Sequence, residues 1–407
     1  MVMTLEQLDV SFKCNRNKPI HRWYHFHAGC SSEFPEKMID LLRIKSGATI
    51  LDPFAGSGTI LVVTKERGIN SVGFDLNPFY VFMARVKTYW EFDTASLFDQ
   101  IQLLSARLEA RRYLIHKEST TLVDNIPPYI WRYFDAEILK QLSVLKEVVL
   151  EVEMETLRNL LLLALSSILI DVSKVHYVGE TIVFDKAVCT SGINVEEVFM
   201  EKVWEMYSDL ETKQRMTSMS HVETKVEDAR NLISVPDGSL DHVVTHPPYL
   251  NNYNYLLHDR LPMFFLEYFK TLSDEKKMRT LIMGSVDSNK PSAKLSEIPI
   301  VQDIAKKVKK TRDKERYDAI IEYCSSMSLF FRNLHDKLRE DGYCAMLVGN
   351  SYVRGVMVPL DVIIAKIAEQ NGFLVVANSV VRDRGNGAFQ HLYNGKLYES
   401  IVVLKRI

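Results

Sequence analysis

The stretch ATILDPFAGSGTILVVTKERG, residues 48–68, carries the clearest indication of the fold. An apolar strand-like segment ends at Asp52, a glycine-rich turn follows, and a helix is predicted to begin near Thr59. The next stretch, NSVGFDLNPFYVFMARVK (residues 70–87), repeats the order of strand, turn and helix. Two consecutive strand–helix units predict an α/β fold with a parallel sheet.

The following part of the chain, residues 91–220, has a different pattern. It contains long helical patterns and few strand signals, and we interpret it as a helical insertion. Its longest apolar run, LLLLALSSILI (160–170), is shorter than the ~20 residues that a membrane-spanning helix needs, so we expect a buried helix. Residues 1–90 and 221–407 are then predicted to form one α/β domain around this insertion.

The α/β pattern resumes in the last part of the chain. Strand-like segments lie within 221–232, 238–249 and 341–351, and a helix is predicted over 359–372. The closing segment, 373–406, has the pattern of an antiparallel hairpin. We therefore predict a Rossmann-like sheet that ends in an antiparallel hairpin and is interrupted by the helical insertion.

Composition excludes several classes of protein. The chain has 407 residues, of which 47% are hydrophobic and 25% charged, and these values exclude a disordered chain, a coiled coil and a collagen. The 50 Lys and Arg residues are balanced by 52 Asp and Glu residues, so any nucleic-acid surface must be a local patch. Five scattered cysteines and a first segment without a secretory pattern lead us to expect a cytoplasmic protein without a membrane partner.

The turn from Asp52 to Thr59 is the first candidate binding site. Gly56 and Gly58 allow a tight turn and close approach of a ligand, and the helix that follows presents free N–H groups. The spacing is neither that of a P-loop nor G-x-G-x-x-G. An ordinary tight turn between strand and helix is the alternative interpretation.

Two further acidic residues fall at the ends of predicted strands. Asp75 follows the second strand, where acids of doubly wound folds reach ribose hydroxyls. Asp228 ends another strand, where it could accept a hydrogen bond from an adenine amino group. Either acid alone is explained equally well by a helix cap or a turn. Together with Asp52, they predict a ligand that contains adenosine.

The second candidate site is the tetrapeptide His246-Pro247-Pro248-Tyr249, which follows a strand. Two prolines fix φ and remove N–H donors, so this is a rigid turn with free carbonyl groups. The carbonyl of Pro247 and an acceptor at position 246 could hold an exocyclic amino group. Tyr249 could stack on a flat base and favour the positive charge that grows on an attacking amine. A proline-rich turn with a packed tyrosine is the alternative.

The glycine-rich turn, Asp75, Asp228 and the X-Pro-Pro-Tyr turn together resemble the amino-group DNA methyltransferases. These enzymes transfer a methyl group from S-adenosylmethionine to cytosine N4 or adenine N6. The resemblance is closest to the cytosine-N4 enzymes of restriction-modification systems, which typically have Ser-Pro-Pro-Tyr followed by an Asn/Tyr-rich stretch. Further segments that resemble the family are 21–39, 250–255, 278–286 and 348–373.

The resemblance implies a class I methyltransferase fold, S-adenosylmethionine as cofactor, and double-stranded DNA as partner, with a cognate restriction endonuclease as a second partner to consider. It implies that His246, Pro247, Pro248 and Tyr249 hold a base that has left the duplex. The insertion at 91–220 would help to recognise DNA. The cofactor-binding residues that the resemblance implies are Phe26, Asp52, Pro53, Phe54, Ala55, Gly56, Ser57, Gly58, Thr59, Asp75, Leu76, Asp228 and Ala229.

Position 246 departs from the family pattern, which has Ser there, or Asp or Asn in the adenine-N6 branch. A neutral imidazole can accept one hydrogen bond from an amino group, and a protonated imidazole cannot. We therefore expect activity to fall as the pH drops through the pKa of His246, and flat activity from about pH 6 to 8 would count against this role. An adenine-N6 or RNA amino methyltransferase, and an inactive module that binds nucleic acid, stay open as alternatives.

A metal site is not expected. His21, His25, His27 and Cys30 are close in sequence, but their spacing matches no common zinc site.

Overall fold

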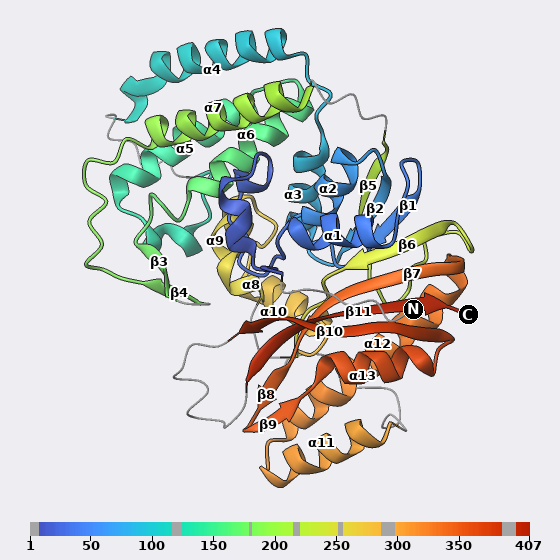
Figure 1. Cartoon of the computed structure of the whole chain (residues 1–407). Helices are drawn as coiled ribbons and strands as arrows, with labels where there is room; N and C mark the ends of the chain where they lie inside the picture. Colours follow the sequence, from blue (N-terminus) through green and yellow to red (C-terminus); the bar gives the residue numbers. More distant parts are fainter. Residues whose placement is uncertain are drawn as a thin grey trace.

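The computed structural model describes residues 8–115, 124–178, 181–214, 220–250, 255–285, 298–384 and 396–407. A twisted sheet crosses the middle of the molecule with helices on both faces, and a group of helices lies beyond one end of the sheet (Figure 1).

The sheet has seven strands in the order β10-β11-β7-β6-β1-β2-β5. From β5 to β7 neighbouring strands are parallel, whereas β11 is antiparallel to both β7 and β10. This arrangement confirms the predicted Rossmann-like sheet with a terminal antiparallel hairpin. The strands are β1 (Thr49–Asp52), β2 (Asn70–Asp75), β5 (Val222–Val226), β6 (Leu240–Thr245), β7 (Leu338–Gly349), β10 (Phe373–Arg384) and β11 (Leu397–Arg406).

Alternate residues of the central strands enter two different cores. Leu51 and Val243 pack with α12 and α13, whereas Ile50 and Val244 pack with α1 and α2. Because side chains alternate along a strand, a continuous apolar run buries both faces of the sheet. The helices beside the sheet are α1 (Glu33–Leu41), α2 (Thr59–Glu66), α3 (Pro78–Thr88), α12 (Lys314–Lys337) and α13 (Leu360–Glu369).

The order of the strands reverses between β1 and β6. The chain proceeds from β1 outward to β2 and β5, and later from β6 outward to β7 in the opposite direction. In open α/β sheets, ligands bind beyond the carboxyl ends of the strands at such a switch point. The topology therefore makes the residues that follow β1 and β6 candidates for ligand binding.

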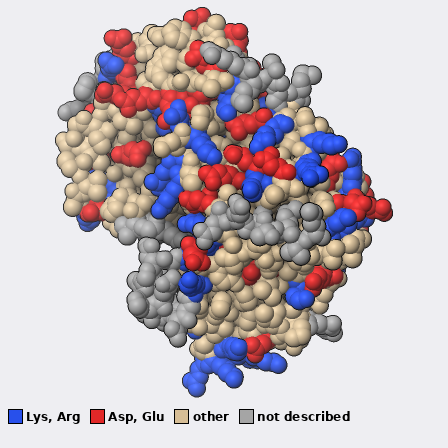
Figure 2. Space-filling view, in the orientation of Figure 1, with Lys and Arg blue, Asp and Glu red and all other residues tan. Residues whose placement is uncertain are grey.

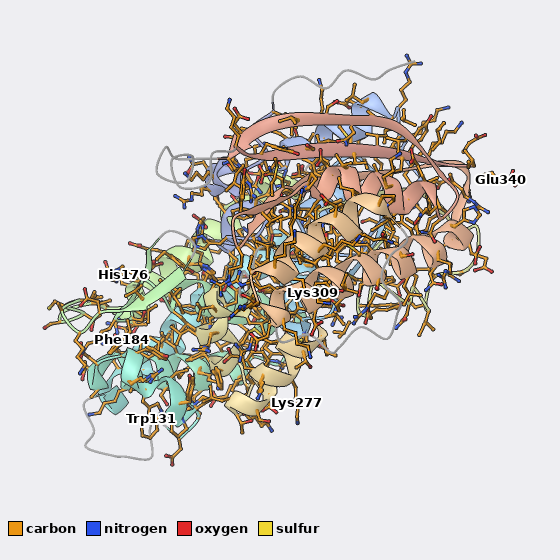
Figure 3. All side chains as sticks on the ribbon, turned by 90° about the horizontal axis from the view of Figure 1, so that it is seen from below. Trp131, His176, Phe184, Lys277, Lys309 and Glu340 are labelled. Carbon is orange, nitrogen blue, oxygen red and sulfur yellow. The ribbon has the colours of Figure 1, made fainter. Side chains whose placement is uncertain are left out.

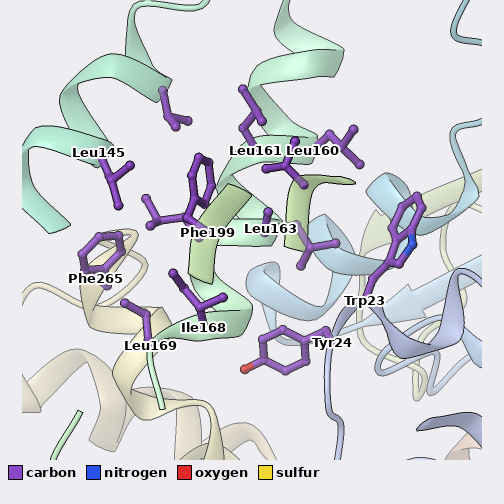
Figure 4. Packing of buried hydrophobic residues seen from close by; sticks show 14 of the residues in the cluster. Trp23, Tyr24, Leu145, Leu160, Leu161, Leu163, Ile168, Leu169, Phe199 and Phe265 are labelled. Atoms are coloured by element: carbon purple, nitrogen blue, oxygen red, sulfur yellow. The ribbon is translucent and has the colours of Figure 1, made fainter. Parts of the chain in front are cut away.

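The predicted insertion is mainly helical, but it also contains a short two-stranded hairpin that the sequence did not predict. Its apolar helices pack around Trp23 and Tyr24 of the N-terminal segment, together with Phe265 (Figure 4). Most of the 160–170 run lies in α6, which ends at Ile168, and most of its residues are buried, as predicted. The elements of the insertion are α4 (Thr94–Ile115), η4 (Pro128–Tyr133), α5 (Ala136–Leu150), α6 (Glu155–Ile168), β3 (Val175–Val178), β4 (Thr181–Phe184) and α7 (Val195–Gln214).

A buried acid ties the N-terminal segment to the insertion. Asp209 of α7 is 2% exposed and accepts hydrogen bonds from the backbone N–H of Ile20, the guanidinium of Arg22 and the indole N–H of Trp23. The insertion and the N-terminal segment therefore share one core. The division of the chain into 1–90 with 221–407 and 91–220 stays a prediction.

The β3–β4 hairpin lies on the side toward which the parallel strands point. In Figure 3, His176 and Phe184 of the hairpin are at the opposite end of the molecule from Glu340, near the start of β7. No helix in the described ranges is long and apolar enough to cross a bilayer. The remaining elements are η1 (Phe12–Asn17), η2 (His21–Trp23), α8 (Tyr255–His258), α9 (Arg260–Phe265), α10 (Leu272–Leu281), α11 (Pro299–Lys310), β8 (Ser351–Val353) and β9 (Val356–Val358).

Candidate active site

The two turns singled out by the sequence follow neighbouring strands. Asp52 ends β1, His246 follows β6, and these strands pair in parallel. The hydroxyl of Thr245 donates a hydrogen bond of 2.7 Å to Oδ1 of Asp52, which is 1% exposed. Residues far apart in the sequence are thus joined at one edge of the sheet by a buried contact.

A small cavity lies between the two turns. Its lining includes Asp52, Phe54 and Gly56 from the first turn, His246 from the second, and Phe26 with residues 28–30 from the N-terminal segment. The N-terminal segment therefore covers the junction of the turns from one side.

The glycine-rich turn permits close backbone contacts on two sides. Gly56 and Gly58 have φ of +47° and +78°. A Cβ on Gly56 would lie 2.9 Å from the ring of Phe26, and one on Gly58 would lie 2.9 Å from Cα of Ala84 in α3. Only glycine accommodates both the positive φ and these contacts. Phe26, which the resemblance assigned to the cofactor site, is thus placed directly against the turn.

The other predicted residues of the turn are largely buried. Phe54 is half-buried, and the hydroxyls of Ser57 and Thr59 are hydrogen-bonded to each other at 3.3 Å. The buried members are Pro53, Ala55, Gly56, Ser57, Gly58 and Thr59.

Asp75 holds the glycine-rich turn from the end of β2. Its carboxylate accepts hydrogen bonds from the N–H groups of Gly56 (3.0 Å) and Asn77 (2.8 Å), and Leu76 beside it is half-buried. Burial raises the pKa of Asp75 to about 6 and that of Asp52 to about 7. Among the described residues neither carboxylate has an ion-pair partner. A buried carboxylate at Asp52 and a half-buried one at Asp75, both without a counterion among the described residues, are a suitable environment for a ligand that carries positive charge.

Asp228 is less available than the sequence suggests. It lies two residues beyond β5, and both of its oxygens accept hydrogen bonds from the guanidinium of Arg230 at 2.6–2.9 Å. Arg230 also approaches Glu322 at 3.5 Å. Ala229, which lies between Asp228 and Arg230 in the sequence, is buried. An adenine amino group would have to share Asp228 with Arg230, so its role in cofactor binding stays a prediction.

A chain of hydrogen bonds starts at the second turn. Nε2 of His246 lies 2.9 Å from the hydroxyl of Tyr249, which donates to Oε1 of Glu399 at 3.1 Å. Among the described residues none donates a hydrogen bond to the carbonyl of Pro247, which is therefore available as an acceptor. Pro247 itself is buried and Pro248 is half-buried.

The ring of Tyr249 is covered rather than open. It is 8% exposed and lies so close to Gly349 that a Cβ there would be 2.6 Å from Cε2 of the ring. The guanidinium of Arg384 lies 4.8 Å from the ring centroid. Stacking of a base on Tyr249, as the sequence suggested, would require Arg384 to move.

The environment of His246 changes the expected pH dependence. Burial, reinforced by the positive charge of Arg384, lowers the pKa of His246 to about 4. The ring is therefore neutral from pH 6 to 8, and flat activity there does not count against its role. The earlier expectation assumed an ordinary histidine pKa, and the buried position corrects it.

We expect the part of methyl transfer that depends on His246 to be lost as the pH falls through about 4, where the imidazole becomes protonated and can no longer accept a hydrogen bond. The measurement is kcat/KM against pH for the parent and for His246→Ser, with circular dichroism at each pH to exclude unfolding. The serine variant should lack the acidic loss. An acidic limb centred near 6.5 in the parent alone would contradict this placement of His246.

Asp52 predicts a second pH effect, on stability. Its pKa is about 7 in the folded protein and 3.8 ordinarily, so the folded state binds the extra proton and stability falls as the pH rises through this window. Asp52→Asn should therefore be more stable than the parent at pH 8 by a few kcal/mol, since one pKa unit corresponds to about 1.4 kcal/mol. Urea unfolding at pH 5 and 8 measures this, with the exposed Asp99→Asn as control. A parent and Asp52→Asn with the same pH dependence would refute it.

Three residues of the closing hairpin enter the site, and the sequence reasoning missed them. Glu399 is 7% exposed and accepts a hydrogen bond from Arg382 at 3.1 Å, while Arg384 donates to the carbonyl of Asn350 at 2.8 Å. A signal was present, because Glu399 is a charged residue inside the apolar strand β11, and Arg382 and Arg384 share one face of β10.

The histidines of the N-terminal segment form an aromatic contact with the insertion. The rings of His25 and His27 are 4.2 Å apart, and His27 lies 4.1 Å from Tyr177 and 4.4 Å from His258. Burial lowers the pKa of His25 to about 4 and that of His27 to about 3. Within the described part of the chain, no group of His, Cys, Asp or Glu is arranged to hold a metal ion.

Comparison with known proteins connects this geometry to a family. Residues 9–85 match the DNA methylase family. This segment contains Phe26, the glycine-rich turn and Asp75. The chain is 23% identical to the Type II methyltransferase M.BsoBI of Geobacillus stearothermophilus, over 94% of this chain and 84% of that protein. It is also 23% identical to the Type II methyltransferase M.MvaI of Kocuria varians, over 87% of this chain and 82% of that protein.

A shorter similarity extends to an RNA enzyme. Over 33% of this chain and 38% of the relative, the identity to tRNA (guanine(10)-N2)-dimethyltransferase of Methanocaldococcus jannaschii is 30%. Together, the family match and the long similarities to Type II enzymes support a methyltransferase of the amino-group DNA class.

Proposed function

We propose that this protein is a site-specific DNA methyltransferase that transfers a methyl group from S-adenosylmethionine to cytosine N4 of a flipped base. One observation carries the proposal: the turn after β1 and the turn after β6 meet at the switch point of the sheet, joined by Thr245 and Asp52. The similarity to Type II methyltransferases along most of the chain supports it. The choice of cytosine N4 rests on the resemblance of residues 246–255 to the cytosine-N4 branch.

The residues between the turns suit the proposed cofactor. S-adenosylmethionine supplies a methyl group made electrophilic by a positively charged sulfur. Burial raises the pKa of Asp52 and Asp75, and the positive charge of the bound sulfonium would favour their ionised forms. The free N–H groups at the start of α2 would receive the cofactor's carboxylate. Phe26 and Phe54 would exclude water from it.

The second turn would orient the target amine. The carbonyl of Pro247 and the imidazole of His246 would accept its two N–H bonds, which directs the nitrogen lone pair at the methyl carbon. Attack by this nitrogen would form the nitrogen–carbon bond, the cofactor would release its methyl group with the electron pair staying on sulfur, and the surplus proton would leave to water. The neutral imidazole of His246 would accept a hydrogen bond from the amine and so act by orientation. Proximity and preorganised acceptors would supply most of the rate.

The net charge of −2 gives no general attraction to DNA, so the contact with DNA would need a local basic surface. Lys and Arg side chains gather over α11 at the lower end of the molecule in Figure 2. Lys306, Lys309 and Lys310 are exposed there, and α11 packs on β9, which follows the carboxyl end of β7. This helix would contact DNA phosphates on one side of the site, and the insertion would contact the DNA on the other side.

The decisive assay supplies labelled S-adenosylmethionine to mixed duplex DNA and RNA, and identifies the methylated base by mass spectrometry. We expect N4-methylcytosine in DNA from the parent, less product from His246→Ser and about 10²- to 10³-fold slower formation by Tyr249→Ala. If the product is N6-methyladenine, the target base is adenine and not cytosine. If methyl groups appear in RNA alone, the substrate is RNA, as the name of the tRNA relative says of that protein. DNA affinity without transfer would reduce the protein to a binding module. A cognate endonuclease partner and a cytoplasmic location stay predictions.

A further inference from the structure

We propose that Glu399 is a positioning residue that acts through Tyr249 to set the tautomer of His246, so that Nδ1 of the imidazole presents the lone pair to the target amine. This inference rests on the proposed function and deepens it, because it assigns a role to a residue 150 positions away from the Pro-Pro-Tyr turn.

The carboxylate of Glu399 is held in place by its neighbours. Glu399 lies on β11 opposite Gly349 of β7, directly beside the ring of Tyr249. Arg382 donates to Oε2 at 3.1 Å, and Nε of Arg384 lies 3.9 Å from Oε1. A carboxylate facing two guanidinium groups is an acceptor only.

The protons of the hydrogen-bond chain can then be assigned in order. The hydroxyl of Tyr249 has one proton, and we assign it to Oε1 of Glu399 at 3.1 Å, because an ionised carboxylate is a stronger acceptor than a neutral imidazole. In the 2.9 Å contact with His246, the tyrosine oxygen must therefore accept, and Nε2 of the imidazole must carry the hydrogen. A neutral imidazole has one N–H, so the lone pair resides on Nδ1.

The second ring nitrogen is left for the substrate. Among the described residues, none forms a hydrogen bond with Nδ1 of His246, and the residue lines the cavity between the two turns with Asp52 and Phe54. A serine at this position could rotate its hydroxyl to accept from the amine, whereas an imidazole accepts only in one tautomer. The chain from Glu399 supplies that selection, which makes a histidine workable at position 246.

Glu399→Gln provides an isosteric test, because it should reverse the chain. Arg382 donates, so the glutamine must turn its carbonyl oxygen toward Arg382 and its NH2 group toward Tyr249. The tyrosine hydroxyl then accepts from the amide and donates to Nε2 of His246, which moves the imidazole hydrogen to Nδ1. The fold should survive, since shape and volume are unchanged.

The tautomer is read directly by nitrogen NMR of the full-length protein with 15N-labelled histidine, without any substrate. The signal of His246 is identified by its absence in His246→Ser. We expect the Nε2–H form in the parent, the Nδ1–H form in Glu399→Gln, and the parental form in Glu369→Gln, an exposed residue at the end of α13. The Nδ1–H form in the parent, or no change in Glu399→Gln, would overturn the inference.

A double-mutant cycle separates positioning from a merely structural effect. Glu399→Gln should lower kcat at least tenfold in the parent and less than twofold in the His246→Ser background, with the KM for S-adenosylmethionine unchanged in both. An equal loss in both backgrounds would show that Glu399 only supports the fold. If the parent transfers no methyl group, the proposed function fails, but the NMR experiment still decides whether Glu399 sets the tautomer.

Discussion

Tyr249→Ala is expected to reduce kcat for methyl transfer by about 10²- to 10³-fold, the usual cost of removing one preorganised transition-state group. Tyr249 contacts His246 through its hydroxyl and packs on Gly349. Its removal frees the imidazole to rotate and breaks the hydrogen-bond chain from His246 to Glu399. Single-turnover measurement of methyl transfer to duplex DNA, with binding of S-adenosylmethionine measured separately, tests this.

Tyr249→Phe is the matched variant, because it keeps the packing and loses only the hydroxyl. Truncation of a buried aromatic residue costs about 3–5 kcal/mol of stability, so Tyr249→Ala must be shown to be folded before its rate is interpreted. We expect cofactor affinity within about threefold of the parent in both variants, since the tyrosine follows β6 and not the glycine-rich turn. A folded Tyr249→Ala with parental kcat would remove this turn from the reaction.

Gly58→Ala is expected to weaken binding of S-adenosylmethionine by at least about 100-fold, a loss of about 2.7 kcal/mol. Gly58 has φ of +78°, and a Cβ there would lie 2.9 Å from both Cα and Cβ of Ala84. Because α3 cannot give way without moving its backbone, the turn itself must shift and lose its shape. Calorimetric titration with the cofactor gives the Kd.

Gly47→Ala is the control for backbone strain. Gly47 has φ of +83°, but nothing lies within 4 Å of a Cβ at that position. Gly47→Ala should lose stability through backbone strain, of the order of 1 kcal/mol, as Gly58→Ala does, but it should keep the parental Kd for the cofactor. Equal affinity of Gly58→Ala and Gly47→Ala for the cofactor would place the cofactor site elsewhere.

Much of the sheet follows from local patterns. Apolar runs such as those ending at Asp52 and Thr245 predict buried parallel strands, because both faces of the sheet are covered and every second side chain enters a different core. The approach of the two turns is also predictable, since the carboxyl ends of parallel strands lie at one edge. The β3–β4 hairpin escaped prediction because its four-residue strands are too short to show a reliable alternation.

The details of the site depend on contacts between distant strands, and a single sequence does not specify them. The register of β11 on β7 places Glu399 opposite Gly349 and thereby beside Tyr249. Nothing in the local sequence of Tyr249 announces that Arg384 will cover it, or that burial will lower the pKa of His246 to about 4. These effects arise from packing, so they modify the pH dependence and the base-stacking role that local reasoning assigned.

A crystal structure of the protein with a non-reactive cofactor analogue and a short cytosine-containing duplex tests the central claim most directly. We predict the analogue between residues 52–59 and His246, with the exocyclic nitrogen of a flipped cytosine within about 3–3.5 Å of the position of the transferable methyl group. An analogue bound away from the glycine-rich turn, or a base held at a distance from residues 246–249, would contradict it.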